Sequence, residues 1–119
     1  MALLIPSLST LFIVLFFLNF AGPLKLADGQ DLKTWCIAKP SSSGAELAAN
    51  IQFACSQLTD CKAIQEGGQC FYPNTPINHA SVAMNFYYQA MSRNPWNCNF
   101  RTSGLITQTD PSYGSCQYA

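Results

Sequence analysis

The pattern of hydrophobic and polar positions divides the chain into two parts. From Leu3 to Phe20 there is no charged residue, and every position from Leu11 to Leu18 is apolar. A run of this kind is typical of the central region of a secretory signal peptide. A single membrane span is the alternative, because no basic residue precedes the run. We favour a signal peptide at residues 1–29, since all the cysteines follow it.

Removal of this leader would leave a short chain. Small residues that suit cleavage lie at Ala21, Ala27 and Gly29, and cleavage after Gly29 would make Gln30 the new terminus. Residues 30–119 are expected to form one domain. A chain of that length buries too little apolar surface to be stable by packing alone, so we expect cross-links to contribute.

The first predicted helix begins after a turn-rich segment. Ser43 can cap it, and Glu46, three positions later, would complete a capping box. We expect this helix to end near Leu58. Its apolar positions follow the three-four spacing of one helical face, and they are Leu47, Ile51, Ala54, Cys55 and Leu58.

The second predicted helix begins where Asn74 or Thr75 can act as the cap and Pro76 can occupy the first turn. We expect it to continue to Ser92, because Asn94 and a proline follow. The predicted buried face consists of Ala80, Met84, Tyr87 and Met91. Residues 105–107 are apolar and β-branched, as in a short strand, and a turn at 110–114 would return the chain toward Cys116.

The charge of the chain narrows the class of partner. Six basic and six acidic residues give a formal net charge of zero. Nucleic-acid binders and membrane-lytic peptides need clustered positive charge, so no nucleic-acid partner is expected. The residues from Cys116 to Ala119 are not the apolar tail of a lipid-anchor signal, so we expect a mature form without a membrane anchor. A neutral ligand fits this composition better.

Six cysteines follow the leader, at positions 36, 55, 61, 70, 98 and 116. An even number behind a secretory leader indicates three disulfides formed in an oxidising compartment. Six cysteines allow 15 pairings, and spacing alone favours only the local pair of Cys55 with Cys61. Paired cysteines leave no thiolate for a metal or for attack, and His79 is the only histidine. We therefore expect no metal site and no cofactor.

Catalysis is not expected either. A glycosidase needs two carboxylates facing each other across the scissile bond. The carboxylates downstream of the leader are interpreted as caps or as solvated charges, and they are Asp31, Glu46, Asp60, Glu66 and Asp110. A small hydrolase is therefore the least favoured function.

Aromatic residues are numerous for so short a chain, and not all of them can be buried. Aromatic rings beside amide side chains suit sugars, because a ring packs on the C–H face of a pyranose and amides pair with its hydroxyls. The second helix offers both kinds of side chain away from its predicted buried face. The candidate sugar-binding residues are Tyr72, Asn85, Phe86, Tyr88 and Gln89, with Trp96 and Phe100 as the other location.

Several motifs together resemble one known family. They are WCIAKP at 35–40, CFYPNTP from Cys70, HASVAMNFYYQ at 79–89, DPSYGSC at 110–116, and the spacing of the six cysteines. This combination is similar to the plant X8 domain, also called carbohydrate-binding module family 43. Members occur as appendages of β-1,3-glucanases, as anchored callose-binding proteins at plasmodesmata, and as short free-standing proteins. This chain resembles the free-standing kind.

The resemblance implies a small disulfide-rich α+β fold with two main helices, a small antiparallel sheet and long coil. It implies the pairs Cys36–Cys98, Cys55–Cys61 and Cys70–Cys116. It also implies non-catalytic binding of β-1,3-glucan such as callose by a secreted monomer in the apoplast or cell wall. An interaction protein of the wall that has lost glucan affinity is the alternative function.

The sequence departs from the family pattern at a few positions. Val82 stands where many members carry tyrosine, and Met84 where phenylalanine is frequent. Arg101 and Thr102 follow Phe100 where glycine often occurs. The change at position 82 removes one ring that a sugar could stack on.

Overall fold

The structure is a computed structural model that describes residues 32–119, and the predicted signal peptide lies outside these residues. Residues 34–119 form one compact unit. Its main elements are β1 (Trp35–Ala38), α2 (Gly44–Gln57), α3 (Pro76–Ala90) and β2 (Gly104–Thr107). Two short 3-10 helices, η1 (Lys62–Ile64) and η2 (Pro95–Cys98), lie in the coil between them. This is the expected α+β fold with two main helices and a small antiparallel sheet.

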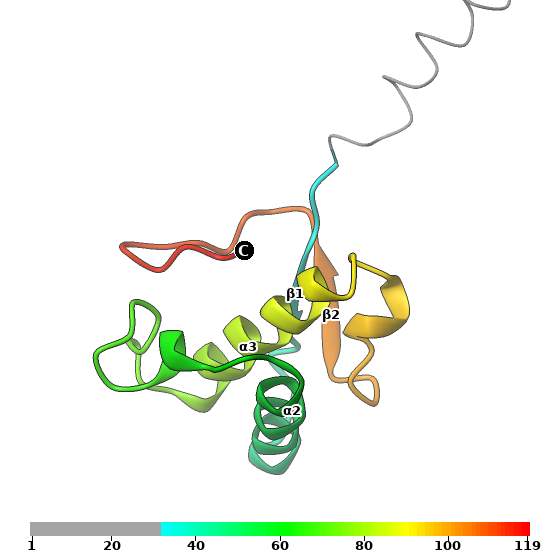
Figure 1. Ribbon diagram of the computed structural model, residues 1–119. Helices are drawn as coiled ribbons and strands as arrows, with labels where there is room; N and C mark the ends of the chain where they lie inside the picture. Colours follow the sequence, from blue (N-terminus) through cyan, green and yellow to red (C-terminus); the bar gives the residue numbers. More distant parts are fainter. Residues whose placement is uncertain (1–31) are drawn as a thin grey trace, which may run out of the picture. The chain divides into compact units, whose positions relative to one another are not determined.

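Helix α3 is the centre of the unit. It packs against α2 and against β1, and β1 in turn pairs with β2 (Figure 1). No helix in the described part of the chain has the length and apolar character needed to cross a membrane.

Both helices begin where the sequence predicts. The Ser43 side chain accepts a hydrogen bond from the backbone N–H of Glu46, and the Glu46 carboxylate accepts one from the backbone N–H of Ser43. These two bonds satisfy amide groups that the first turn of α2 leaves without partners. Thr75 caps α3 by accepting from the N–H of Asn78, and Pro76 occupies the first turn.

Strand β1 is an element that the hydrophobic pattern did not predict. It pairs antiparallel with β2, with Cys36 opposite Ile106 and Ala38 opposite Gly104. In the described chain, its other edge has no strand beside it. That edge lies against α3, whose polar side chains replace the missing strand.

Three residues at four-residue spacing on α3 bind this free edge. The Ser81 hydroxyl accepts a hydrogen bond from Ala38 N at 2.9 Å, and Asn85 Oδ1 accepts one from Cys36 N at 3.0 Å. Gln89 Nε2 donates to the Thr34 carbonyl at 2.9 Å. We call Ser81, Asn85 and Gln89 the polar ladder. It pairs backbone groups that burial would otherwise leave without partners.

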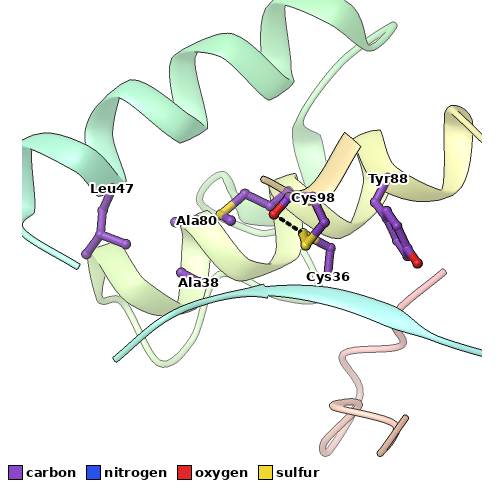
Figure 2. Close-up of a cluster of buried hydrophobic side chains, with 7 residues drawn as sticks. Cys36, Ala38, Leu47, Ala80, Tyr88 and Cys98 are labelled. Atoms are coloured by element: carbon purple, nitrogen blue, oxygen red, sulfur yellow. Dashed lines mark hydrogen bonds between the residues drawn. A yellow bond between two sulfur atoms is a disulfide. The ribbon is translucent and has the colours of Figure 1, made fainter. Parts of the chain in front are cut away.

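The core has two clusters of buried side chains. The first lies between α2, α3 and β1, and Figure 2 shows it around the Cys36–Cys98 disulfide, with members Cys36, Ala38, Leu47, Ala80, Met84, Tyr88 and Cys98. The second lies around the C-terminal segment and contains Trp35, Cys70, Val82, Cys116 and Tyr118. Each cluster includes one long-range disulfide. The bridges therefore lie inside the packed core and tie its elements together.

All six cysteines are paired. The bonds are Cys36–Cys98, Cys55–Cys61 and Cys70–Cys116, which is the pairing that the resemblance implied. The outer two bridges span 62 and 46 residues of sequence, whereas the middle one spans six.

The predicted buried face of α3 was wrong at two of its four positions, because Tyr87 and Met91 are only half-buried. Ala80 and Met84 are fully buried, but the next buried tyrosine is Tyr88, at 2% exposure, and Tyr87 is only half-buried. Positions 80, 84 and 88 lie on one face of the helix. All residues from Ala80 to Asn85 are buried as well, so the buried surface of α3 is wider than the predicted stripe and does not include Tyr87. The Tyr88 hydroxyl bonds to the Thr34 hydroxyl at 2.8 Å.

Candidate functional site

The candidate site is a groove of about 360 Å³ on one side of the helical pair. It is built from α2, the last turns of α3, η2 and the turn after η2. Its lining residues are mainly aromatic and amide side chains, namely Ala49, Asn50, Phe53, Tyr87, Trp96, Asn97, Phe100 and Arg101.

Three rings form the apolar wall of the groove. Phe53 and Tyr87 meet edge to face with centroids 5.1 Å apart, and Phe100 lies 5.9 Å from Tyr87 and 6.2 Å from Phe53. All three interplanar angles lie between 73° and 80°. Edge-to-face contacts of this kind are favourable, and each ring restricts the others. The groove therefore has a fixed aromatic wall before any ligand binds.

Trp96 adds a ring that the protein leaves open to solvent. It is 71% exposed, and Phe53 is 46% exposed. Cys98, in the same short helix η2 as Trp96, is tied to β1 by its disulfide, so the segment that carries Trp96 is anchored. An indole held in solvent by an anchored segment can stack on a flat apolar ligand face.

Amide and hydroxyl groups line the same groove. Asn97 Nδ2 lies 3.3 Å from the Tyr87 hydroxyl oxygen and donates to it. A phenol that accepts this bond keeps its own proton for another acceptor. Asn50 Nδ2 donates to Ser103 Oγ at 2.8 Å and so ties α2 to the turn after η2. The groove thus combines aromatic faces with hydrogen-bonding groups.

The turn that carries Phe100 has an unusual backbone. Phe100, Arg101 and Thr102 have φ angles of 46°, 52° and 69°, in the left-handed region that favours glycine. Thr102 N donates to Asn99 Oδ1 at 2.7 Å, and Ser103 Oγ donates to the Phe100 carbonyl at 2.5 Å. These bonds hold the turn in a conformation that its residue types disfavour.

Gly104 closes this turn. A Cβ atom at position 104 would lie 1.8 Å from the Cys98 carbonyl oxygen, so no side chain fits there. The backbone approaches itself this closely because Gly104 N bonds back to the Asn99 carbonyl at 3.1 Å.

Two of the expected sugar-binding residues line the groove, and five do not. Trp96 and Phe100 lie in it together. Tyr72 lies outside the groove and is 73% exposed, with its carbonyl oxygen accepting a bond from the Tyr113 hydroxyl at 2.6 Å. Phe86 is half-buried, packs on the second core cluster and lines a different, small hollow.

The two amide side chains of α3 that were expected to face a sugar make hydrogen bonds within the protein instead. Asn85 is 1% exposed, and its side chain bonds to Cys36 N. Gln89 Nε2 is engaged by Thr34 and by Asn85 Oδ1, and Tyr88 lies in the core. The physical reason is β1, because an unpredicted strand covers the helix face that was expected to be open.

Sequence reasoning missed most of the groove. Phe53 and Tyr87 were not assigned to it, although a phenylalanine outside the predicted apolar stripe of α2 was a usable signal. Asn97 and Arg101 carried no local signal. They join the groove only because the Cys36–Cys98 bridge and the turn at Gly104 bring this segment back to the helices.

A second hollow of about 380 Å³ lies on the other side of α3. It is lined by Ile37, Pro73, Ile77, Asn78, Ser81, Pro111, Tyr113 and Tyr118. Burial, with a smaller contribution from the nearby Tyr113, raises the pKa of Tyr118 to about 12. The Tyr113 hydroxyl already donates toward the Tyr72 carbonyl and Asn78 Oδ1. This hollow offers few polar groups to a ligand.

Several titratable side chains outside the groove bond to nearby backbone groups. Glu46 completes the α2 cap, Asp60 Oδ1 accepts from Lys62 N, and Asp110 Oδ1 accepts from Ser112 N. His79 Nε2 lies 2.7 Å from the Phe71 carbonyl oxygen. Residues 32–119 contain no group of three or more His, Cys, Asp or Glu side chains arranged to hold a metal ion.

The fold and this site can be compared with known proteins. The family model of the X8 domain matches residues 34–105. The chain belongs to the X8 domain family. The matched range includes every residue that lines the groove.

Relatives of this X8 protein are of two kinds. A glucan endo-1,3-beta-D-glucosidase from Olea europaea is 49% identical over 85 residues, which are 71% of this chain but 18% of that protein. A glucan endo-1,3-beta-glucosidase from Triticum aestivum is 49% identical over 84 residues, with the same two shares. The major pollen allergen Ole e 10 from Olea europaea is 44% identical over 99 residues, which are 82% of this chain and 80% of the allergen. The chain therefore spans under a fifth of the two glucosidases but most of the allergen.

Proposed function

We propose that this X8 protein is a secreted, non-catalytic module that binds β-1,3-glucan of the callose type in the plant cell wall. The observation that carries the proposal is the groove that joins Trp96 to the rings of Phe53, Tyr87 and Phe100. Relatives of the chain named as glucan endo-1,3-beta-glucosidases support the choice of glucan.

The groove suits a neutral sugar chain on physical grounds. A pyranose presents an apolar C–H face and a rim of hydroxyls, so it needs both a ring to stack on and hydrogen-bonding groups at the edge. Trp96 supplies an exposed ring, and Tyr87 and Asn97 supply polar atoms beside it. A hollow of about 360 Å³ has room for a few sugar units and leaves the rest of a polymer outside.

The lining residues support binding without hydrolysis. No carboxylate lines the groove, whereas glycoside hydrolysis needs two of them across the scissile bond. The carboxylates of Glu46 and Asp60 accept bonds from nearby backbone N–H groups instead. A reducing-sugar assay with the glucan should therefore show no release of product above background.

Secretion is proposed from the cysteines and the leader together. All three disulfides lie in the described domain, and disulfides persist in oxidising compartments. N-terminal sequencing of secreted protein should give a first residue between Gly22 and Gln30. We propose that the secreted form is a monomer.

The test of the glucan site compares two exposed aromatic residues. Trp96→Ala removes the exposed ring of the groove, and Tyr72→Ala removes a ring of almost equal exposure that lies outside it. We expect Trp96→Ala to weaken binding of a soluble β-1,3-glucan oligosaccharide at least about tenfold, which corresponds to about 1.4 kcal/mol. Tyr72→Ala should bind as the wild type does. Isothermal titration calorimetry measures both, and thermal melts check that each variant is folded.

The opposite pattern would move the site. If Tyr72→Ala loses binding while Trp96→Ala keeps it, the glucan binds elsewhere on the domain. If the wild-type protein binds neither the oligosaccharide nor insoluble β-1,3-glucan, a wall interaction protein without glucan affinity replaces the proposed function.

A further inference from the structure

Arg101 is the one charged residue among the eight that line the groove. Its side chain is exposed. The acidic residues of the described chain, Glu46, Asp60, Glu66 and Asp110, all lie outside the lining. The groove therefore carries a positive charge without a carboxylate of its own to neutralise it.

The backbone holds Arg101 in place. It is the middle of three consecutive residues in this turn with positive φ, and L residues rarely adopt that conformation in succession. Asn99, Ser103 and, through Ser103, Asn50 of α2 fix the turn by hydrogen bonds. The same turn places the Phe100 ring against Phe53 and Tyr87. Strained backbone that the surroundings hold in place is common at ligand sites.

A guanidinium recognises one chemical group especially well. Its planar fork of N–H donors matches the two oxygens of a carboxylate, whereas a neutral hydroxyl can use only one donor at a time. A neutral glucan would satisfy the rings and amides of the groove but would offer the guanidinium only single hydroxyl contacts. A chain that also carries a carboxylate would satisfy both.

We infer that the groove prefers an acidic glycan, a hexose chain in which some units carry a uronic-acid carboxylate that pairs with Arg101. This inference rests on the proposed function, since the rings must first bind the sugar backbone. Trp96 and the three-ring wall supply stacking that any such chain shares. Arg101 then adds the selectivity for charge.

The test uses two ligands that differ only in the group at the primary-alcohol position of their sugar units. One is a soluble β-1,3-glucan oligosaccharide, and the other is the same oligosaccharide with its primary alcohols oxidised to carboxylates. The measured quantity is the ratio of their dissociation constants for each protein variant, so that a change in overall affinity cancels. We expect wild type to bind the oxidised chain roughly fivefold more tightly at low salt.

Three variants test whether Arg101 causes the preference for the oxidised chain. Arg101→Gln should bring the ratio close to one, and Arg101→Lys should retain part of it, because a lysine keeps the charge without the fork. Arg93→Gln is the matched control, since Arg93 bonds to Gln89 and does not line the groove, and it should leave the ratio as in wild type. Raising the salt from about 0.01 M to about 1 M shortens the screening length from about 30 Å to about 3 Å and should reduce the wild-type ratio.

The outcomes separate this inference from the proposed function. If the neutral chain binds and Trp96→Ala abolishes that binding, but the oxidised chain gains nothing, the acidic preference is wrong and the glucan site stands. The acidic preference is also wrong if Arg93→Gln lowers the ratio as much as Arg101→Gln, because net charge would then explain it. If neither chain binds the wild type, both proposals are wrong.

Discussion

Two adjacent tyrosines on α3 show how much a single residue step decides. Tyr88 lies in the core and bonds to Thr34, whereas Tyr87 lies half-buried in the wall of the groove. Successive residues of a helix point about 100° apart, so neighbours in sequence face different surroundings. Truncation of Tyr88 should therefore lower mainly the stability of the fold, and truncation of Tyr87 mainly the affinity for the ligand.

We predict that Tyr88→Ala costs about 3–5 kcal/mol of unfolding free energy, because it leaves a cavity beside Met84 and the Cys36–Cys98 bridge. Tyr88→Phe removes only the hydroxyl bond and should cost about 1 kcal/mol. Tyr87→Ala should lower glucan affinity more than it lowers stability. Urea unfolding of the three variants, with calorimetric titration of those that fold, measures both effects. A larger loss of stability for Tyr87→Ala than for Tyr88→Ala would contradict this assignment.

At the scale of elements, the polar ladder explains how a two-stranded sheet is held in a small domain. A lone hairpin-like pair of strands is marginal in water, and β1 gains support because α3 binds its second edge. Asn85 is the central member, with bonds to Cys36 N and to the Ala119 carbonyl. Its side chain is nearly completely buried.

Removing this side chain should loosen β1. We predict that Asn85→Ala lowers the unfolding free energy by about 1–3 kcal/mol, because the Cys36 amide would lose its partner in a buried place. Gln89→Ala, at the half-buried end of the ladder, should cost less. Denaturant unfolding gives the energies, and hydrogen exchange of the Cys36 amide reports the strand directly. Unchanged exchange at Cys36 in Asn85→Ala would show that the ladder does not hold β1.

The same elements show which features of the fold can be predicted from the sequence. The helix caps at Ser43 and Thr75 were predictable because a cap depends on residues within one turn. Strand β1 was not, because its four residues show no alternation and its support comes from a helix far along the chain. Buried polar residues such as Asn50 and Asn85 also escape a hydrophobic pattern, since their burial depends on distant backbone groups.

The residues of the candidate site were likewise predictable only where they lie close together in the sequence. Trp96 and Phe100 were named as candidates because they are aromatic residues close together in sequence. Phe53 and Tyr87 come from two different helices, and only tertiary packing brings their rings within about 6 Å of each other and of Phe100. Spacing favoured only the local Cys55–Cys61 bridge, and the other two pairs came from the family resemblance, because six cysteines allow 15 pairings.

For the whole molecule, the three disulfides differ in how deeply they are buried and in the length of the loop that each one closes. Cys36–Cys98 and Cys70–Cys116 are buried in the two core clusters and close long loops. Cys55–Cys61 is half-buried at the end of α2 and closes a loop of six residues. A cross-link that closes a longer loop restricts the unfolded chain more.

Mild reduction should therefore open one bridge before the others. We predict that a low concentration of thiol, without denaturant, reduces Cys55–Cys61 first, because its two cysteines are only half-buried whereas the other four are buried. The domain should stay folded and keep its glucan affinity in this form. Alkylation followed by mass spectrometry identifies the opened pair, and circular dichroism follows the fold.

A double variant tests the same point without reductant. Cys55→Ala with Cys61→Ala should fold with a moderately lower melting temperature, whereas Cys36→Ala with Cys98→Ala should not fold stably, because it also leaves a gap in the first core cluster. Equal losses in the two variants would show that the position of a bridge matters little.

The central claim is that β-1,3-glucan binds in the groove beside Trp96. The most direct measurement is an NMR titration of the ¹⁵N-labelled domain with a soluble β-1,3-glucan oligosaccharide. The account predicts the largest shifts at the Trp96 indole N–H, at the Asn97 side-chain amide and along the turn of residues 99–102. Shifts centred instead on Tyr72 and Tyr113, with the Trp96 indole unmoved, would contradict it.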